Sequence, residues 1–70
     1  MREVQFGDMV EVRGFPVDDY GTGVDGPEES YVGRVVAIHW DFSQVTVEKS
    51  PGVCYQFRMS DVRRIERHEP

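Results

Sequence analysis

Segments in the middle of the chain carry its clearest pattern of apolar and polar positions. The segment 44–50, QVTVEKS, alternates two valines with polar side chains. The segment 53–59, VCYQFRM, places an apolar or aromatic residue at every second position in the same way. A period of two is typical of a strand with one face in a core and the other in water. The pattern therefore predicts two strands, with Gln44 on the wet side of the first.

Residues typical of a turn separate these two segments, and the segment before them alternates less regularly. Pro51 fixes a φ that suits a turn and Gly52 can adopt positive φ, so a tight hairpin is expected between the two strands. The preceding segment, 31–40, is apolar on both faces, which predicts either a strand that crosses from one side of a barrel to the other or a bulge near Val36. Gly33 within it indicates either a sharp bend or a close approach of another strand.

The remainder of the chain supplies a first strand, a long loop and a short last strand. Residues 9–13 alternate as the other strands do, and a 3-10 turn capped by Ser60 is expected before the last strand. The segment 14–30 is rich in glycine and acidic residues and has no periodicity. A loop this long in a small domain is either functional or disordered. We expect Phe15 or Tyr20 from this loop to pack against the sheet.

Length and composition limit what the chain can be. Its 70 residues make one domain. The single cysteine excludes an internal disulfide and no Cys/His cluster has zinc spacing, so neither a metal nor a cofactor is predicted. No apolar run reaches the ~20 residues that cross a membrane and no secretory segment is present, so a cytoplasmic protein is expected. The net charge of −5 weighs against general nucleic-acid binding, because phosphate neutralisation supplies most non-specific affinity.

Several spaced motifs together resemble a known fold family. They are Gly7-Asp8-x-Val10-x-Val12, Gly33-x-Val35-x-x-Ile38, Val45-x-Val47 and Phe57-Arg58-x-x-Asp61-Val62. In this combination the chain resembles the SH3-like small-barrel superfamily, with its KOW, Tudor and Agenet-type members, over about residues 6–66. The resemblance implies an all-β fold, a single five-stranded antiparallel SH3-like barrel. A long acidic loop would follow the first strand, and a 3-10 turn would precede the last.

The resemblance also implies a binding groove between the long loop and the connection of the second and third strands. The matching aromatic residues here are Tyr20 on the loop and Trp40 and Phe42 at the connection. Acidic loop residues would attract a basic or mixed protein surface, because complementary charge speeds encounter. These residues are Asp18, Asp19, Asp25, Glu28 and Glu29. The leading hypothesis is a non-catalytic binding module, such as a small accessory subunit or regulator, that docks onto a protein partner.

A nucleic-acid-binding barrel of the KOW type is the alternative hypothesis. Its contacts would come from the basic concentration near the end of the sequence, Arg58, Arg63, Arg64 and Arg67. The long loop lacks the basic residues that the KOW resemblance would imply, which favours the protein partner. An enzyme is not predicted, because Cys54 lies in mid-strand without a spaced His or Asp partner. No small-molecule substrate is expected either.

Overall fold

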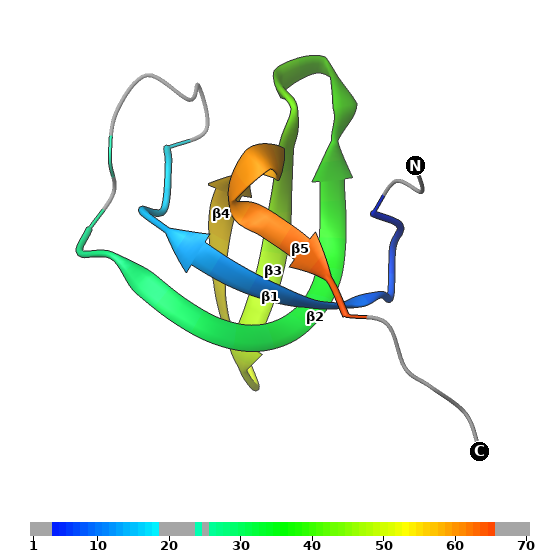
Figure 1. Cartoon of the computed structure of the whole chain (residues 1–70), viewed down its shortest axis with the longest axis horizontal. Coiled ribbons are helices and arrows are strands. Elements are labelled where there is room, and N and C mark those ends of the chain that lie inside the picture. Colours follow the sequence, from blue (N-terminus) through cyan, green and yellow to red (C-terminus); the bar gives the residue numbers. More distant parts are fainter. Residues whose placement is uncertain (1–3, 19–23, 25, 66–70) are drawn as a thin grey trace.

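The computed structural model describes residues 4–18, 24 and 26–65, which form one antiparallel sheet of five strands (Figure 1). The strands are β1 (Met9–Gly14), β2 (Glu29–His39), β3 (Gln44–Ser50), β4 (Val53–Arg58) and β5 (Val62–Arg64). Two 3-10 turns join strands that are consecutive along the chain: η1 (Trp40–Phe42) between β2 and β3, and η2 (Met59–Asp61) between β4 and β5. The strand order is β4-β3-β2-β1-β5, so β4 and β5 are the edges. The predicted all-β class, the five antiparallel strands and the 3-10 turn before the last strand are confirmed.

β2 holds the sheet together, because it pairs with β1 along its first part and with β3 along its second. The register between β2 and β3 shifts between Val35 and Ala37. An extra residue at such a point bends a strand and increases its twist. Figure 1 shows β2 curving along the lower side of the molecule. The bulge predicted near Val36 is confirmed.

The core lies on the inner face of this curved sheet. It consists of the fully buried side chains of Val10, Val12, Val35, Val45, Val47 and Phe57. They come from alternate positions of four strands, as the period of two predicts. Burying an apolar side chain of this size stabilises the fold by ~1.5–3 kcal/mol relative to leaving it in water. Tyr31 and Tyr55 pack against the margin of this cluster.

Two glycines occupy the positions where their lack of a side chain is needed. A Cβ on Gly33 would collide with the backbone carbonyl of Glu48 and would lie 3.0 Å from Cε2 of Tyr31. The close approach predicted at Gly33 is therefore confirmed. Gly52 adopts a φ of +80° between β3 and β4, in the left-handed region that favours glycine, and this confirms the predicted hairpin.

Two details of the prediction are wrong, one on a strand and one at a turn. Gln44 does not face water, since it is only 2% exposed. Nε2 of Gln56 donates to Oε1 of Gln44 across 3.4 Å, so the buried amide has a partner on the neighbouring strand. The turn before β5 begins at Met59 rather than at Ser60, and no side chain caps it. Its N-cap residue is Arg58, whose backbone is extended.

The beginning of the long loop lies along the outer edge of β4. Phe15, one of the two residues predicted to pack there, is exposed, whereas Val17 is buried. The Val17 N–H donates to the Gln56 carbonyl oxygen at 2.8 Å, and Val17 also forms an isolated antiparallel bridge with Val24. The loop therefore adds a short contact to an edge strand. Tyr20, the other residue predicted to pack there, lies outside the described residues.

Candidate functional site

Two pairs of aromatic residues lie near opposite ends of β3. Trp40 and Phe42 belong to η1, just before β3 begins, and are 54% and 57% exposed. Tyr31 and Tyr55 lie near the other end, with 6.5 Å between their ring centroids. Figure 1 shows the connection from β2 to β3 at the top of the molecule and the turn from β3 to β4 at the bottom. We call the first pair the open end and the second pair the closed end.

Backbone hydrogen bonds hold the turn at the open end. The Ser43 N–H donates to the Trp40 carbonyl oxygen at 3.2 Å, and the Met59 N–H donates to the Ser43 carbonyl oxygen at 2.9 Å. Ser43 itself has a φ of 54°, in the left-handed region, which reverses the chain into β3. The two exposed rings are therefore carried by a backbone that is fixed on both sides.

The open end surrounds a shallow hollow of about 310 Å³. Its lining consists of Ile38, His39, Trp40, Asp41 and Phe42. Asp41, which lies between the two aromatic residues in sequence, is exposed, and no basic side chain in the described part of the chain pairs with it. His39 Nε2 lies 3.4 Å from Thr46 Oγ1. Apolar ring faces and a carboxylate are thus presented together to solvent.

The structure separates most of the described acidic residues of the predicted groove from its aromatic residues. Glu29 begins β2 and pairs with Lys49, which lies roughly 17 Å along β3 from Gln44 at the ordinary rise of a strand. Glu28 precedes it and is exposed. Asp18 lines a groove beside the edge strand β4. Asp19, Tyr20 and Asp25, also predicted to bind a partner, lie outside the described residues.

A lysine covers the two rings of the closed end. Lys49 Nζ lies 5.8 Å from the ring centroid of Tyr31 and 5.9 Å from that of Tyr55, within the range of cation–π attraction. The same ammonium is 2.9 Å from Oε1 of Glu29. The Tyr31 hydroxyl donates to the Val47 carbonyl oxygen at 2.7 Å. Ring faces, hydroxyl, ammonium and carboxylate therefore satisfy one another within the chain.

These contacts shift two ionisation equilibria in the same direction. Burial, aided by the nearby Glu29 carboxylate, raises the pKa of the Tyr31 hydroxyl above its ordinary value of 10.0. The hydrogen bond and the charge of Glu29 raise the pKa of Lys49 above its ordinary value of 10.5. Both groups therefore keep their protons at neutral pH, and the ion pair is intact there.

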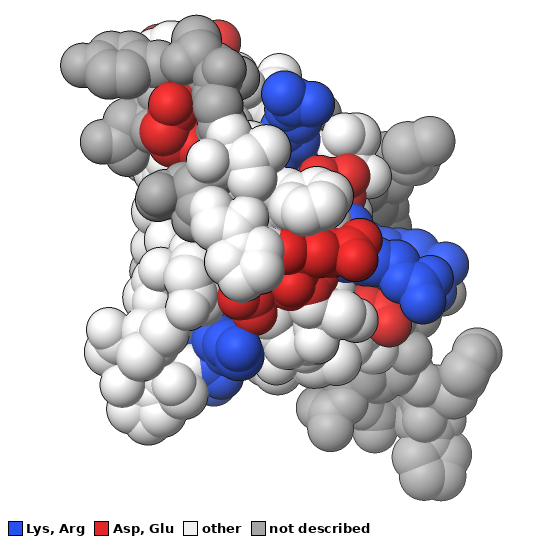
Figure 2. Space-filling model, turned by 90° about the vertical axis from the view of Figure 1, so that its left-hand side faces the viewer, with Lys and Arg blue, Asp and Glu red and all other residues white. Residues whose placement is uncertain are grey.

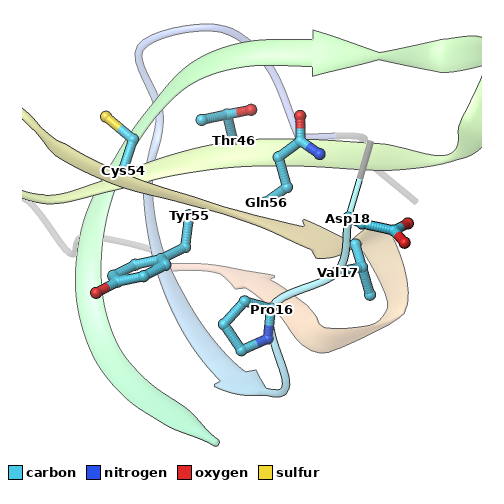
Figure 3. Close-up of a pocket in the computed structure, with 7 residues that line it drawn as sticks. All are labelled: Pro16, Val17, Asp18, Thr46, Cys54, Tyr55 and Gln56. Atoms are coloured by element: carbon cyan, nitrogen blue, oxygen red, sulfur yellow. The ribbon is translucent and has the colours of Figure 1, made fainter. Parts of the chain in front are cut away.

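A groove of about 390 Å³ runs beside β4 (Figure 3). Its lining consists of Pro16, Val17, Asp18, Thr46, Cys54, Tyr55 and Gln56. Figure 3 shows Cys54 and Gln56 on one side of the β4 ribbon and Tyr55 on the other. The Cys54 thiol is free and exposed. Within residues 4–18, 24 and 26–65, no three His, Cys, Asp or Glu side chains group closely enough to hold a metal ion.

The arginines of the alternative hypothesis are spread over the surface and partly paired. Arg63 contacts Glu11 at 3.3 Å and Arg64 contacts Asp8 at 3.2 Å. Arg58 is exposed, and Arg67 lies outside the described residues. Figure 2 shows acidic side chains in the middle of one face with basic side chains around them. On this face the two signs of charge are mixed, without a continuous basic surface.

Sequence reasoning missed two residues that complete these sites. Asp41 is not among the predicted binding residues, although its position between two aromatic residues in the sequence is a usable signal. Lys49 belongs to the predicted strand 44–50 and is given no further role there. Folding the chain back at the turn after Trp40 places the start of β2 beside the end of β3, which would have brought Lys49 near Tyr31.

Comparisons with protein-family models, with curated proteins and with solved structures find no match. The fold and the site therefore define the chain only as a small all-β protein with one five-stranded antiparallel sheet. No helix of the described residues is long and apolar enough to span a membrane.

Proposed function

We propose that this protein is a non-catalytic binding module that docks onto a protein partner through the open end. The observation that carries the proposal is the exposure of both Trp40 and Phe42, more than half of each, on one fixed turn. Neighbouring exposed rings beside a hollow are typical of an interaction surface. A turn held by backbone hydrogen bonds presents them at little entropic cost on binding.

The partner surface is basic or mixed in charge. Asp41 lines the same hollow as the two rings and has no ion pair among the described residues, and the whole chain carries a net charge of −5. A guanidinium or ammonium group can contact a carboxylate and an aromatic face at the same time. The opposite net charges would also speed association and set its orientation.

The remaining parts of the proposal concern fold family and location. The strand order, the 3-10 turn before β5 and the edge contact made by Val17 support an SH3-like small barrel. In such a barrel, η1 would lie at the connection that the resemblance assigns to the groove. A free thiol at Cys54 is compatible with a reducing compartment and supports a cytoplasmic protein.

Affinity purification from the native host with tagged wild-type protein, followed by calorimetry with each purified partner, tests this proposal. The double variant Trp40→Ala/Phe42→Ala should weaken binding by about 30-fold or more, as expected for buried aromatic anchors. The control Val32→Ala removes another exposed apolar residue, on β2, and should bind like the wild type. A partner that binds the double variant as tightly as the wild type would contradict the proposal.

The variant Asp41→Asn tests how much the carboxylate contributes to binding, separately from the two aromatic rings. This variant should bind a basic partner more weakly, mainly through slower association at low salt. The difference from wild type should shrink as salt is added, because exposed charges are screened. An effect of equal size at all salt concentrations would argue against a role for the carboxylate in attracting the partner.

A further inference from the structure

The closed end contains every element of a binding site for an ammonium group, and the chain fills that site itself. Two tyrosine rings face Lys49 Nζ at 5.8 and 5.9 Å, and a Glu29 oxygen lies 2.9 Å from it. The Glu29 side chain is only 13% exposed, and its carboxylate contacts the ammonium. A partly buried carboxylate is stabilised by a cation beside it.

The sheet fixes the groups that receive the ammonium. Glu29 is paired with Gly14 of β1, and Tyr31 is paired with Val12. The Tyr31 hydroxyl is also hydrogen-bonded to the backbone of β3. Tyr55 lies in the regular part of the β3–β4 ladder. Strand pairing therefore fixes the backbone of all three residues, and the hydrogen bond to β3 also holds the Tyr31 ring in place.

Lys49 is held much less firmly. The register between β3 and β4 shifts between Glu48 and Ser50, and Lys49, which lies in between, has no paired residue on β4. Its side chain is 44% exposed, and the turn at Pro51 and Gly52 follows closely. Bulges commonly redirect a side chain at a functional position. Partly exposed ion pairs are weak, so the lysine can leave without disrupting the sheet.

We propose that Glu29, Tyr31 and Tyr55 form a binding site for a lysine side chain of a partner polypeptide, and that Lys49 occupies this site until the partner displaces it. The occupant is a lysine because the site offers one carboxylate oxygen and two ring faces around a single ammonium position. The acidic net charge of the chain favours a basic partner. This site lies at the other end of β3 from Trp40 and Phe42, so it does not depend on the function proposed for the open end.

Removing the internal lysine tests the proposal directly. The probe is Nα-acetyl-lysine methylamide, and its uncharged counterpart is Nα-acetyl-norleucine methylamide. Binding is followed by NMR on the ring and backbone signals of Tyr31 and Tyr55. Lys49→Met keeps much of the apolar stem and empties the ammonium position. This variant should bind the lysine probe about tenfold more tightly than wild type, if the site is open about a tenth of the time in the wild type.

Further variants distinguish this site from non-specific attraction. Adding Glu29→Gln to Lys49→Met should abolish the gain, and the norleucine probe should bind neither protein. Equal affinity in wild type and Lys49→Met, or equal binding of the two probes, would overturn the proposal. If Lys49→Met does not fold, wild-type protein with saturating probe gives the answer. The Lys49 Cε protons should then shift toward their solvent-exposed values, and unchanged signals would again overturn the proposal.

Discussion

The open and closed ends of β3 both carry two aromatic rings and a carboxylate, but these groups are exposed at the open end and covered at the closed end. At the closed end, Lys49 covers the rings of Tyr31 and Tyr55 and pairs with Glu29. At the open end, Trp40 and Phe42 are exposed and no side chain of the described residues pairs with Asp41. Rings and a carboxylate are thus present at both ends, and among the residues that the structure describes only the closed end also has a cation beside them.

The two ends also contribute differently to stability. Tyr31 packs with its ring centroid 5.9 Å from that of Phe57, in the centre of the core. By contrast, none of the three residues of η1 is buried. A domain of this size has only roughly 3–5 kcal/mol of net stability, so any loss at the closed end is serious. The following predictions compare the two ends by their effects on the free energy of unfolding.

Gly33→Ala should have the largest effect, because it attacks the packing of the closed end. Its Cβ would collide with the Glu48 carbonyl and would press on Val47 and Tyr31. Because backbone cannot move aside as a flexible side chain can, we expect a loss of about 2–3 kcal/mol. Urea denaturation followed by circular dichroism measures it.

Val32→Ala is the matched control for that substitution. It lies one position before Gly33 on β2, faces outward and is already half exposed. Its cost should stay below about 1 kcal/mol, the span of strand propensities. If both variants lost the same stability, the close contact at Gly33 would not be the cause.

Alkaline pH should have the next largest effect on the free energy of unfolding, because it weakens the contacts of the closed end. The pKa of Tyr31 is raised in the folded state, so above pH 10.0 the unfolded chain binds fewer protons than the folded chain. The free energy of unfolding then falls as pH rises. The raised pKa of Lys49 acts in the same direction, and its stabilisation is present below its ordinary pKa of 10.5 and lost above it. Denaturant titrations at increasing pH measure this slope.

Tyr31→Phe isolates the tyrosine part of this effect. At neutral pH it removes the hydrogen bond to Val47 and should cost about 1 kcal/mol. The difference from wild type should shrink as the pH rises above about 10, because the unfolded wild-type chain then loses its tyrosine proton while the folded chain keeps it. A difference that stays constant as the pH rises would show that the hydroxyl contributes nothing to the pH dependence.

The strands could be predicted from sequence because their pattern is local. Alternation follows from strand geometry, so Val45, Val47 and Phe57 identify the inner face without knowledge of their neighbours. The burial of Gln44 could not be predicted in this way, because its partner Gln56 lies on another strand. Which apolar residue of the loop is buried also depends on a distant contact, here between Val17 and β4.

The candidate sites could be predicted only in part for the same reason. A turn position makes burial of Trp40 and Phe42 harder, but the sequence leaves their exposure open, and the structure shows that both are exposed. The cluster around Lys49 depends on the register of β2 against β3, which a bulge shifts by one residue. A shift of one residue moves every following side chain to the other face. Charge counting assigned Glu29 to a partner, whereas in the structure it pairs with Lys49.

The smallest effect on stability is expected at Trp40, where the proposed effect on binding is largest. Trp40→Ala should change the free energy of unfolding by no more than about 0.5 kcal/mol, as for other exposed positions. Tyr55→Ala, the comparable truncation at the closed end, should cost about 2 kcal/mol because that ring is partly buried against the core. Both are measured by urea denaturation at pH 7. If Trp40→Ala proved as destabilising as Tyr55→Ala, Trp40 would be part of the packing, and this would count against the proposed binding surface. If Trp40→Ala leaves stability unchanged, the ring does not contribute to the fold, as the proposed role in binding expects.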